Sequence, residues 1–176
     1  KSLKRKSFLK TSVVAGVGAS ILPGIVMGSK SANDRIRVGF IGTGLRGQWV
    51  LWLVTKYDNV EIPAICDIDD VMIEKTLKIL EEAKRPVPRI YKKNDEDFRN
   101  MLANEDLDGV YIATPWEWHH PMAMAAMENG CNVGTEVPAA LTINECWDLV
   151  NTSEESGKLC MIMENVNYRR DIMAVL

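Results

Sequence analysis

Short apolar segments with strand character alternate with segments of helical spacing along most of this 176-residue chain. The strand-like segments are residues 36–41, 60–66, 89–91, 109–113, 132–136 and 159–163. The helical segments are residues 46–56, 70–83, 95–103, 121–128 and 144–156. Because a helical crossover returns the chain to the same sheet in the same direction, this alternation predicts an α/β fold. We expect a doubly wound, mostly parallel sheet with helices on both faces.

The first 30 residues differ in charge from the rest of the chain. They contain six Lys and Arg and no Asp or Glu, whereas the remainder has 15 Lys and Arg against 24 Asp and Glu, a net charge of about −9. A phosphate-binding surface needs a basic face. We therefore expect no nucleic-acid partner.

Residues 1–32 have the order of an export signal, with a basic start, KSLKRKSFLK, before an apolar run at residues 13–27. Glycines and a proline interrupt that run, so a removable signal fits better than a stable membrane span. A short surface helix and a tethered N-terminus are the alternatives. The stretch RKSFLK resembles a twin-arginine signal with Lys6 in place of the second arginine. These features predict a periplasmic protein, or a cytoplasmic one if the signal does not function.

The four cysteines, Cys66, Cys131, Cys146 and Cys160, include no CxxC pair. Their spacing is typical neither of a zinc site nor of a disulfide framework, so we expect no metal centre. Free cysteine packs as a small apolar side chain. We therefore expect four buried thiols.

A glycine-rich stretch, GTGLRG, lies between the first predicted strand and the first predicted helix. Gly42, Gly44 and Gly47 have the G-x-G-x-x-G spacing of a dinucleotide-binding loop. The first glycine of such a loop makes a tight turn, the second lets the backbone approach a pyrophosphate, and the third allows close packing of helix on strand. The N-terminus of the helix adds unpaired N–H groups and a partial positive charge.

Two charged residues point to a particular nucleotide. Arg46 would place a cation near the pyrophosphate, and a solvated arginine in the first helical turn is the alternative. Asp67 directly follows the second predicted strand, twenty residues after Gly47. A carboxylate there accepts hydrogen bonds from the adenine-ribose hydroxyls and repels a 2′-phosphate, which favours NAD over NADP. Asp69 or Asp70 would cap the following helix.

The segment TPWEWHHP follows the fourth predicted strand and holds both histidines of the chain. Ligands bind outside the carboxyl ends of parallel strands, so we expect this segment to be a loop near the nucleotide. His119 is a candidate for proton transfer, and a histidine that only holds the loop is the alternative. His120 is expected to pack. Trp116 and Trp118 would flank the nicotinamide or a sugar, or pack as a lid.

Four stretches are together similar to the N-terminal half of the Gfo/Idh/MocA oxidoreductase family: GFIGTGLRG, CDID, YIATPWEWHHPMAMAAMENG and GTEVP. More narrowly, PWEWHH, TEVPAALTINECWDLV and MENVNYRRD resemble its branch assigned to glycoside hydrolase family 109, the NAD-dependent α-N-acetylgalactosaminidases. The resemblance covers Ile36 to Leu176. It implies an NAD cofactor, a Rossmann-type domain at residues 33–165, and an α+β substrate domain. Residues 166–176 would begin that second domain, most of which is absent from this chain.

The resemblance also implies which residues contact NAD. These lie in the glycine loop and after later strands: Leu45, Arg46, Asp67, Trp116, Glu117, Trp118, His119, Glu136, Val137 and Asn165. Tyr168 and Arg169 are the last candidates in the chain for contacts with a sugar, or they simply begin the second domain. The main catalytic residues are expected beyond Leu176, in the second domain.

The fifth predicted strand ends in Glu136-Val137-Pro138. Sugar dehydrogenases of the wider family carry Glu-Lys-Pro there, with the lysine near the reacting hydroxyl. Valine cannot donate or accept a proton, so a simple dehydrogenase would lack an important acid-base group. Glu136 would reach the nicotinamide or its ribose, and a Glu that caps the next turn is the alternative.

A redox-neutral glycosidase acting on N-acetylhexosaminides fits the resemblance best. In that mechanism a hydride leaves sugar C3 for NAD+, the acidified C2 proton is removed, the C1 substituent is eliminated, water adds, and the hydride returns. A net NAD-dependent sugar dehydrogenase and a non-catalytic NAD- and sugar-binding protein are the alternatives. The expected partner is a carbohydrate, and a homo-oligomer stays open.

Overall fold

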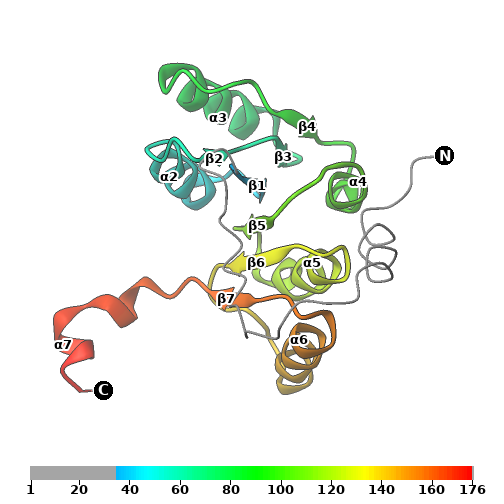
Figure 1. Ribbon diagram of the computed structural model, residues 1–176, viewed down its shortest axis with the longest axis vertical. Helices are drawn as coiled ribbons and strands as arrows, with labels where there is room; N and C mark the ends of the chain where they lie inside the picture. Colours follow the sequence, from blue (N-terminus) through cyan, green and yellow to red (C-terminus); the bar gives the residue numbers. More distant parts are fainter. Residues whose placement is uncertain (1–34, 176) are drawn as a thin grey trace, which may run out of the picture. The chain divides into compact units, whose positions relative to one another are not determined.

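A computed structural model describes residues 35–175, and its elements are labelled in Figure 1. The strands are β1 (Ile36–Ile41), β2 (Val60–Glu61), β3 (Ala64–Cys66), β4 (Arg89–Tyr91), β5 (Gly109–Ile112), β6 (Asn132–Thr135) and β7 (Cys160–Ile162). All their pairings are parallel, in the order β4-β3-β1-β5-β6-β7, with β2 also beside β1. The predicted parallel sheet is confirmed.

Two of the expectations concern residues at the ends of the chain. The expected export signal at residues 1–32 lies outside the described residues, and so does Leu176, the final residue of the printed sequence. The structure therefore does not test the signal, nor the expectation that the main catalytic residues lie beyond Leu176. Both stay predictions.

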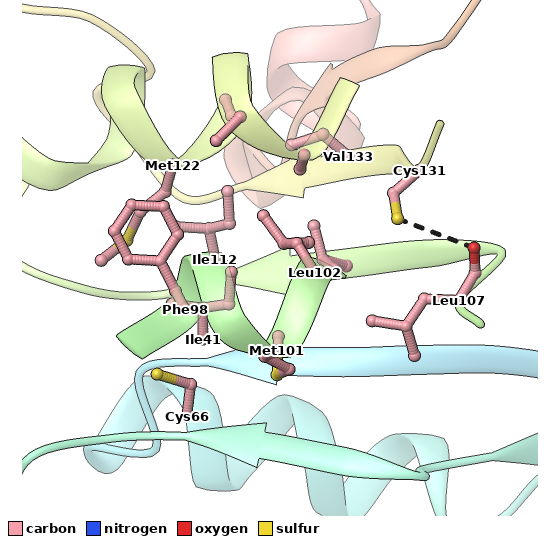
Figure 2. Packing of buried hydrophobic residues seen from close by; sticks show 14 of the residues in the cluster. Ile41, Cys66, Phe98, Met101, Leu102, Leu107, Ile112, Met122, Cys131 and Val133 are labelled. Carbon is pink, nitrogen blue, oxygen red and sulfur yellow. Dashed lines mark hydrogen bonds between the residues drawn. The ribbon is translucent and has the colours of Figure 1, made fainter. Parts of the chain in front are cut away.

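Among the described residues, five helices cover the two faces of this sheet: α2 (Leu45–Val54), α3 (Asp70–Glu82), α4 (Asp97–Asn104), α5 (Trp116–Glu128) and α6 (Ile143–Ser156). Two short helices, η1 (Asn165–Tyr168) and α7 (Arg170–Met173), follow β7. Apolar side chains of α2 and α3 pack on one face around Phe40 and Ile65. Those of α4, α5 and α6 pack on the other face around Ile112 and Val133 (Figure 2). The predicted doubly wound α/β fold is therefore confirmed.

The second predicted strand is interrupted. Residues 60–66 form two short strands, β2 and β3, with Ile62 and Pro63 between them. Proline has no N–H to contribute to a ladder, so the pairing with β1 is broken at this point. β3 then ends at Cys66, which places Asp67 at the carboxyl edge of the sheet as predicted.

Helix α5 begins at Trp116, so the expectation of a loop up to Pro121 was wrong. Pro115 takes the N-cap position, and the Trp118 N–H donates to its carbonyl across 3.0 Å. Pro121 lies inside the helix rather than at its start. His119, Met122 and Ala123 are buried, at the spacing of one helical face, which carries the WEWHH stretch into the helix.

Local signals at two helix starts agree with the structure. The Asp69 side chain caps α3 and accepts from the backbone N–H groups of Val71 and Met72, so Asp69 and not Asp70 is the cap. Thr142 and Glu145 form a reciprocal capping box at the start of α6.

All four cysteines are free thiols, but they are not all buried. Cys66 and Cys131 are buried and Cys160 is partly buried, whereas Cys146 is exposed on α6. Leu149 is the buried residue of α6, so most of that helix faces outward and the expectation for Cys146 was wrong. Within residues 35–175, no helix has both the length and the apolar character needed to cross a bilayer.

Candidate functional site

The glycine loop joins β1 to α2 at the carboxyl edge of the sheet, and two of its glycines are required by close packing. Gly42 has φ +86°, and a Cβ atom there would lie 2.5 Å from the Ala113 carbonyl oxygen. A Cβ at Gly47 would lie 2.1 Å from the carbonyl oxygen of Gly42. A side chain at either position would displace backbone, so the tight turn and the close approach of α2 both depend on glycine.

Gly44 has a different environment. A Cβ atom there would meet nothing within 4 Å, so the space beside this residue is open. Gly44 is also the N-cap of α2, and no side chain caps this helix. The first N–H groups of α2 therefore face an open space in which an anion such as a pyrophosphate would be stabilised.

Asp67 is tied to the same loop. Its Oδ2 atom accepts from the Thr43 backbone N–H across 2.5 Å and from the Thr43 hydroxyl across 2.9 Å, and Oδ1 accepts from the Asp69 N–H across 2.9 Å. The Thr43 side chain is fully buried. These bonds hold the carboxylate at the end of β3 beside the glycine loop, where the sequence predicts a contact with ribose.

A cavity of about 300 Å³ opens over this edge of the sheet. It is lined by Gly42, Gly44 and Asp67 from the expected nucleotide site, and by Trp118 from the first turn of α5. The Trp118 ring also packs edge-on against Phe98, with centroids 6.3 Å apart. Trp118 is therefore both a wall of the cavity and part of the core packing.

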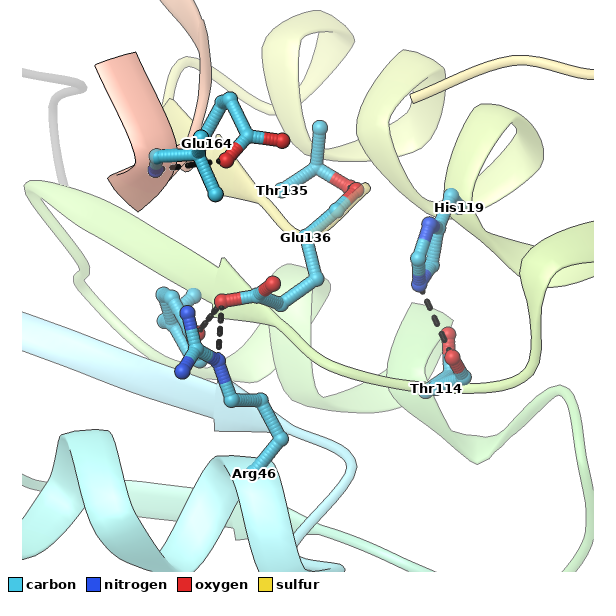
Figure 3. Close-up of polar contacts among 8 residues, drawn as sticks. Arg46, Thr114, His119, Thr135, Glu136 and Glu164 are labelled. Carbon is cyan, nitrogen blue, oxygen red and sulfur yellow. Dashed lines mark hydrogen bonds and ion pairs between the residues drawn. The ribbon is translucent and has the colours of Figure 1, made fainter. Parts of the chain in front are cut away.

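Arg46 and Glu136 meet across the middle of the edge (Figure 3). The Arg46 Nε donates to Glu136 Oε1 across 2.7 Å, and the Tyr111 hydroxyl donates to the same oxygen. The Arg46 guanidinium also lies over the Trp49 ring, 4.9 Å from its centroid. Arg46 thus has partners within the site, while 39% of its side chain stays exposed, and Glu136 accepts from these two side chains rather than from a helix N-terminus.

The protonation states around this carboxylate follow from burial and pairing. Burial, followed by the hydrogen bond to Glu136, raises the pKa of Tyr111. The hydrogen bond to Glu136 raises the pKa of Arg46 as well. The phenol and the guanidinium therefore both keep their protons at neutral pH and act as donors.

His119 is buried, with 1% of its surface exposed, and both ring nitrogens contact backbone carbonyls. Nε2 lies 2.8 Å from the Thr114 oxygen (Figure 3) and Nδ1 lies 2.7 Å from the Pro138 oxygen, which follows a cis Val137–Pro138 bond. This histidine joins the segment before α5 to the turn after β6. The arrangement favours the alternative of a histidine that holds the loop, because neither nitrogen faces open space.

The other expected contact residues lie around this edge with exposed side chains. They are Leu45, Trp116, Glu117, Val137 and Asn165. Tyr168, the expected sugar contact, is the last residue of η1. Their roles stay predictions. In the described part of the chain, no group of three or more His, Cys, Asp or Glu is placed to hold a metal ion.

Two residues with a part in the site were not singled out from the sequence. Tyr111 lies within the apolar strand GVYI, and a buried tyrosine hydroxyl requires a partner, which is the one signal that could have found it. Thr43 is the polar residue between the first two glycines. Its buried side chain binds Asp67, a contact that depends on the pairing of β1 with β3.

The glycine loop, the acid after β3 and the cavity between them define a dinucleotide-binding protein of the Rossmann type. A family described as an oxidoreductase family with an NAD-binding Rossmann fold, Gfo/Idh/MocA, matches residues 36–164. The chain belongs to this family, and its cofactor is NAD. The residues present fit that cofactor, with open space at Gly44, an uncapped helix start and a fixed carboxylate at Asp67.

Two curated relatives match 98% of the chain. One is a glycosyl hydrolase family 109 protein of Parabacteroides distasonis, 44% identical, of which the match covers 40%. The other is an alpha-N-acetylgalactosaminidase of Tannerella forsythia, 45% identical, of which the match covers 41%. The chain thus spans about two fifths of the length of these relatives.

Solved structures share the fold. The WlbA dehydrogenase of Chromobacterium violaceum, solved with NADH and UDP-GlcNAcA, superposes with a TM-score of 0.69 at 21% identity, over 82% of this chain and 39% of that one. Another dehydrogenase of that organism gives a TM-score of 0.66 at 26% identity, over 81% of this chain and 39% of the other. The part of this chain that they share carries the Rossmann sheet.

Proposed function

We propose that this chain is the NAD-binding part of a glycosidase that hydrolyses N-acetylhexosaminides of the α-N-acetylgalactosaminide type without net redox change. The observation that carries the proposal is the 44–45% identity to the two curated relatives over 98% of the chain. One of them is named for that activity. The exposed Val137 after β6 supports the same proposal, because a valine cannot serve as the proton-transfer group of a simple dehydrogenase.

Bound NAD+ supplies a reversible hydride acceptor. In the proposed sequence, sugar C3 loses a hydride and its hydroxyl loses a proton, which leaves a ketone. The ketone acidifies the C2 proton, whose removal expels the C1 substituent. Water then adds at C1, a proton returns to C2, and the hydride and a proton return to the C3 carbonyl. One glycosidic bond is exchanged for a bond to water, and no electrons are gained or lost overall.

The residues of this chain serve mainly to bind and orient. Asp67 would receive the adenine ribose, and the first turn of α2 would receive the pyrophosphate. Arg46 and Tyr111 hold the Glu136 carboxylate, which would contact the nicotinamide half of NAD. With His119 bound to two carbonyls, we expect the base that removes the C2 proton to come from beyond Leu176.

The test is turnover of an aryl α-N-acetylgalactosaminide in D2O by a full-length protein that contains this chain. Released sugar should carry deuterium at C2, and NADH should not accumulate. A β-linked substrate of the same sugar serves as the control for the anomer. Hydrolysis that leaves C2 free of deuterium would count heavily against the proposed mechanism.

A net NAD-dependent sugar oxidoreductase is the second candidate, favoured by the 26% identical dehydrogenase among the solved structures. The same assay separates the two, because this activity would accumulate one NADH per sugar oxidised. Binding of NAD and sugar with no turnover would instead favour a non-catalytic binding protein.

We also propose export through residues 1–32, on the strength of their basic start and apolar run. Fractionation of cells that express the protein with and without this segment tests the proposal. An Arg5→Gln change should retain the protein in the cytoplasm if the twin-arginine pathway is used. An unchanged distribution between the fractions would count against this route.

A further inference from the structure

Glu136 uses one carboxylate oxygen for two donors. Oε1 accepts from Arg46 and from Tyr111, and in the part of the chain that the structure describes, Oε2 has no donor. The side chain is 11% exposed, so it is almost enclosed by protein. A carboxylate has room for about four hydrogen bonds, so this arrangement leaves acceptor capacity on one side.

The two donors come from different elements, a helix and a strand. Arg46 is in the first turn of α2, next to the expected pyrophosphate position. Tyr111 is in β5, buried against Phe40 with ring centroids 5.5 Å apart. Tyr111 is held by the core, and the Arg46 guanidinium lies over the partly exposed Trp49 ring. The carboxylate therefore has a defined orientation before any ligand is bound.

We propose that Tyr111 is a positioning residue for NAD: together with Arg46 it holds Oε1 of Glu136 and thereby directs Oε2 toward the nicotinamide half of the cofactor. A ribose hydroxyl or the carboxamide of nicotinamide would then donate a hydrogen bond to Oε2 and use the acceptor capacity that the carboxylate has left. This inference rests on the NAD site alone and does not depend on the glycosidase activity proposed above.

A buried tyrosine also needs a partner simply for stability. The chain offers a matched control for that role in Tyr91 of β4. Its hydroxyl donates to Glu105 across 2.7 Å, and Arg89 pairs with the same Glu105 oxygen across 3.0 Å. The two clusters have the same three residue types, and none of their six residues lines the cavity. They differ in place, because only the Tyr111 cluster includes a residue of the first turn of α2, directly after the glycine loop.

The experiment compares Tyr111→Phe with Tyr91→Phe in the full-length protein by calorimetric titration with NAD and with ADP. ADP lacks the nicotinamide riboside and reports on the rest of the site. We expect Tyr111→Phe to weaken NAD binding about 5- to 20-fold, equivalent to about 1–1.8 kcal/mol, and to change ADP binding less than about 2-fold. Tyr91→Phe should lower the melting temperature and leave the affinities for both ligands unchanged.

A second arm uses Glu136→Gln. This variant should itself weaken NAD binding and spare ADP, and in its background Tyr111→Phe should cause no further loss. An equal loss for NAD and ADP in Tyr111→Phe, or additive losses in the double variant, would overturn the inference. So would unchanged NAD binding in Glu136→Gln, whether or not Tyr111→Phe folds. Each of these outcomes can be read without measuring turnover.

Discussion

The Arg46 guanidinium donates to the Glu136 carboxylate across 2.7 Å and so joins the first turn of α2 to the end of β6. These residues lie 90 positions apart in the sequence, on the two sides of the point where strand order reverses between β1 and β5. In parallel α/β sheets this point is where ligands bind. The ion pair therefore connects the two halves of the nucleotide site through side chains.

Replacement of Arg46 by Met should destabilise the protein. Glu136 is 11% exposed, and without the arginine its charge would be left nearly buried and without a counterion. We expect the free energy of unfolding to fall by about 1–3 kcal/mol. Urea unfolding checks this, and adding Glu136→Gln should restore part of the loss.

The control for this change is Arg99→Met. Arg99 pairs with Glu96 on the surface of the protein, where both side chains are more than half exposed. We expect that substitution to cost at most about 0.5 kcal/mol. Equal effects at Arg46 and Arg99 would mean that the Glu136 pair behaves as an ordinary surface pair.

Two glycines of the loop should respond differently to alanine. A Cβ at Gly47 would lie 2.1 Å from a backbone oxygen, so Gly47→Ala should lower the free energy of unfolding by more than about 2 kcal/mol. Gly44 has open space and a negative φ of −65°, so Gly44→Ala should change stability by less than about 0.5 kcal/mol. It should instead weaken NAD binding, because the methyl group would occupy the approach to the pyrophosphate. Thermal unfolding and NAD titration of both variants check these expectations. Normal NAD binding by Gly44→Ala would contradict the expected role of Gly44 at the pyrophosphate.

Asp67 should determine the preference for NAD over NADP. Asp67→Asn keeps an oxygen that can accept from Thr43 and removes the charge that would repel a 2′-phosphate. We expect the ratio of the two dissociation constants to shift toward NADP by about 10-fold, equivalent to about 1.4 kcal/mol. Titration with both nucleotides measures it. Asp70→Asn, at the exposed first residue of α3, should leave the ratio as it is.

Local pattern accounts for the features that could be predicted. The glycine spacing, the place of Asp67 and the Asp69 cap each depend on residues close together in the sequence, and the structure has all three. The sequence prediction placed the start of α5 too late, because proline is common at the first residue of a helix and Pro121 fitted that position. In the structure the helix begins at Trp116, and its first turns include the buried His119. Local sequence does not report that burial.

The polar contacts of the site depend on strand register instead. Tyr111 pairs with Gly134 in the sheet, and Glu136 lies two residues beyond that glycine on the same face. Only this register brings the Tyr111 phenol to the Glu136 carboxylate, and neither residue type nor spacing encodes it. The same holds for Thr43 and Asp67, whose contact follows from the pairing of β1 with β3.

Replacement of His119 should lower the stability of the protein, because this histidine contacts backbone carbonyls with both ring nitrogens. His119→Leu leaves the Thr114 and Pro138 carbonyls without their ring partner, and we expect a loss of about 2–4 kcal/mol in the free energy of unfolding. His119→Gln retains one donor and should lose less. The neighbouring His120, whose Nε2 lies 3.5 Å from Asp148, is the control, and His120→Gln should cost less than about 1 kcal/mol. A His119→Gln protein of full stability with no turnover would instead identify a proton-transfer group.

Cys66 should make the protein sensitive to alkaline pH. Burial raises the pKa of this thiol to about 12, from an ordinary value near 9. The folded state therefore holds the proton more tightly than the unfolded state, so the contribution is complete below about pH 9 and is lost as the pH rises toward about 12. The slope attributable to Cys66 should approach about 1.4 kcal/mol per pH unit within that window.

Burial raises the pKa of Cys131 and Cys160 in the same direction, so Cys66→Ala should flatten the dependence without removing it. Urea unfolding from about pH 8 to about pH 11 measures it, and Cys146→Ala, at an exposed position, should keep the slope of the parent protein.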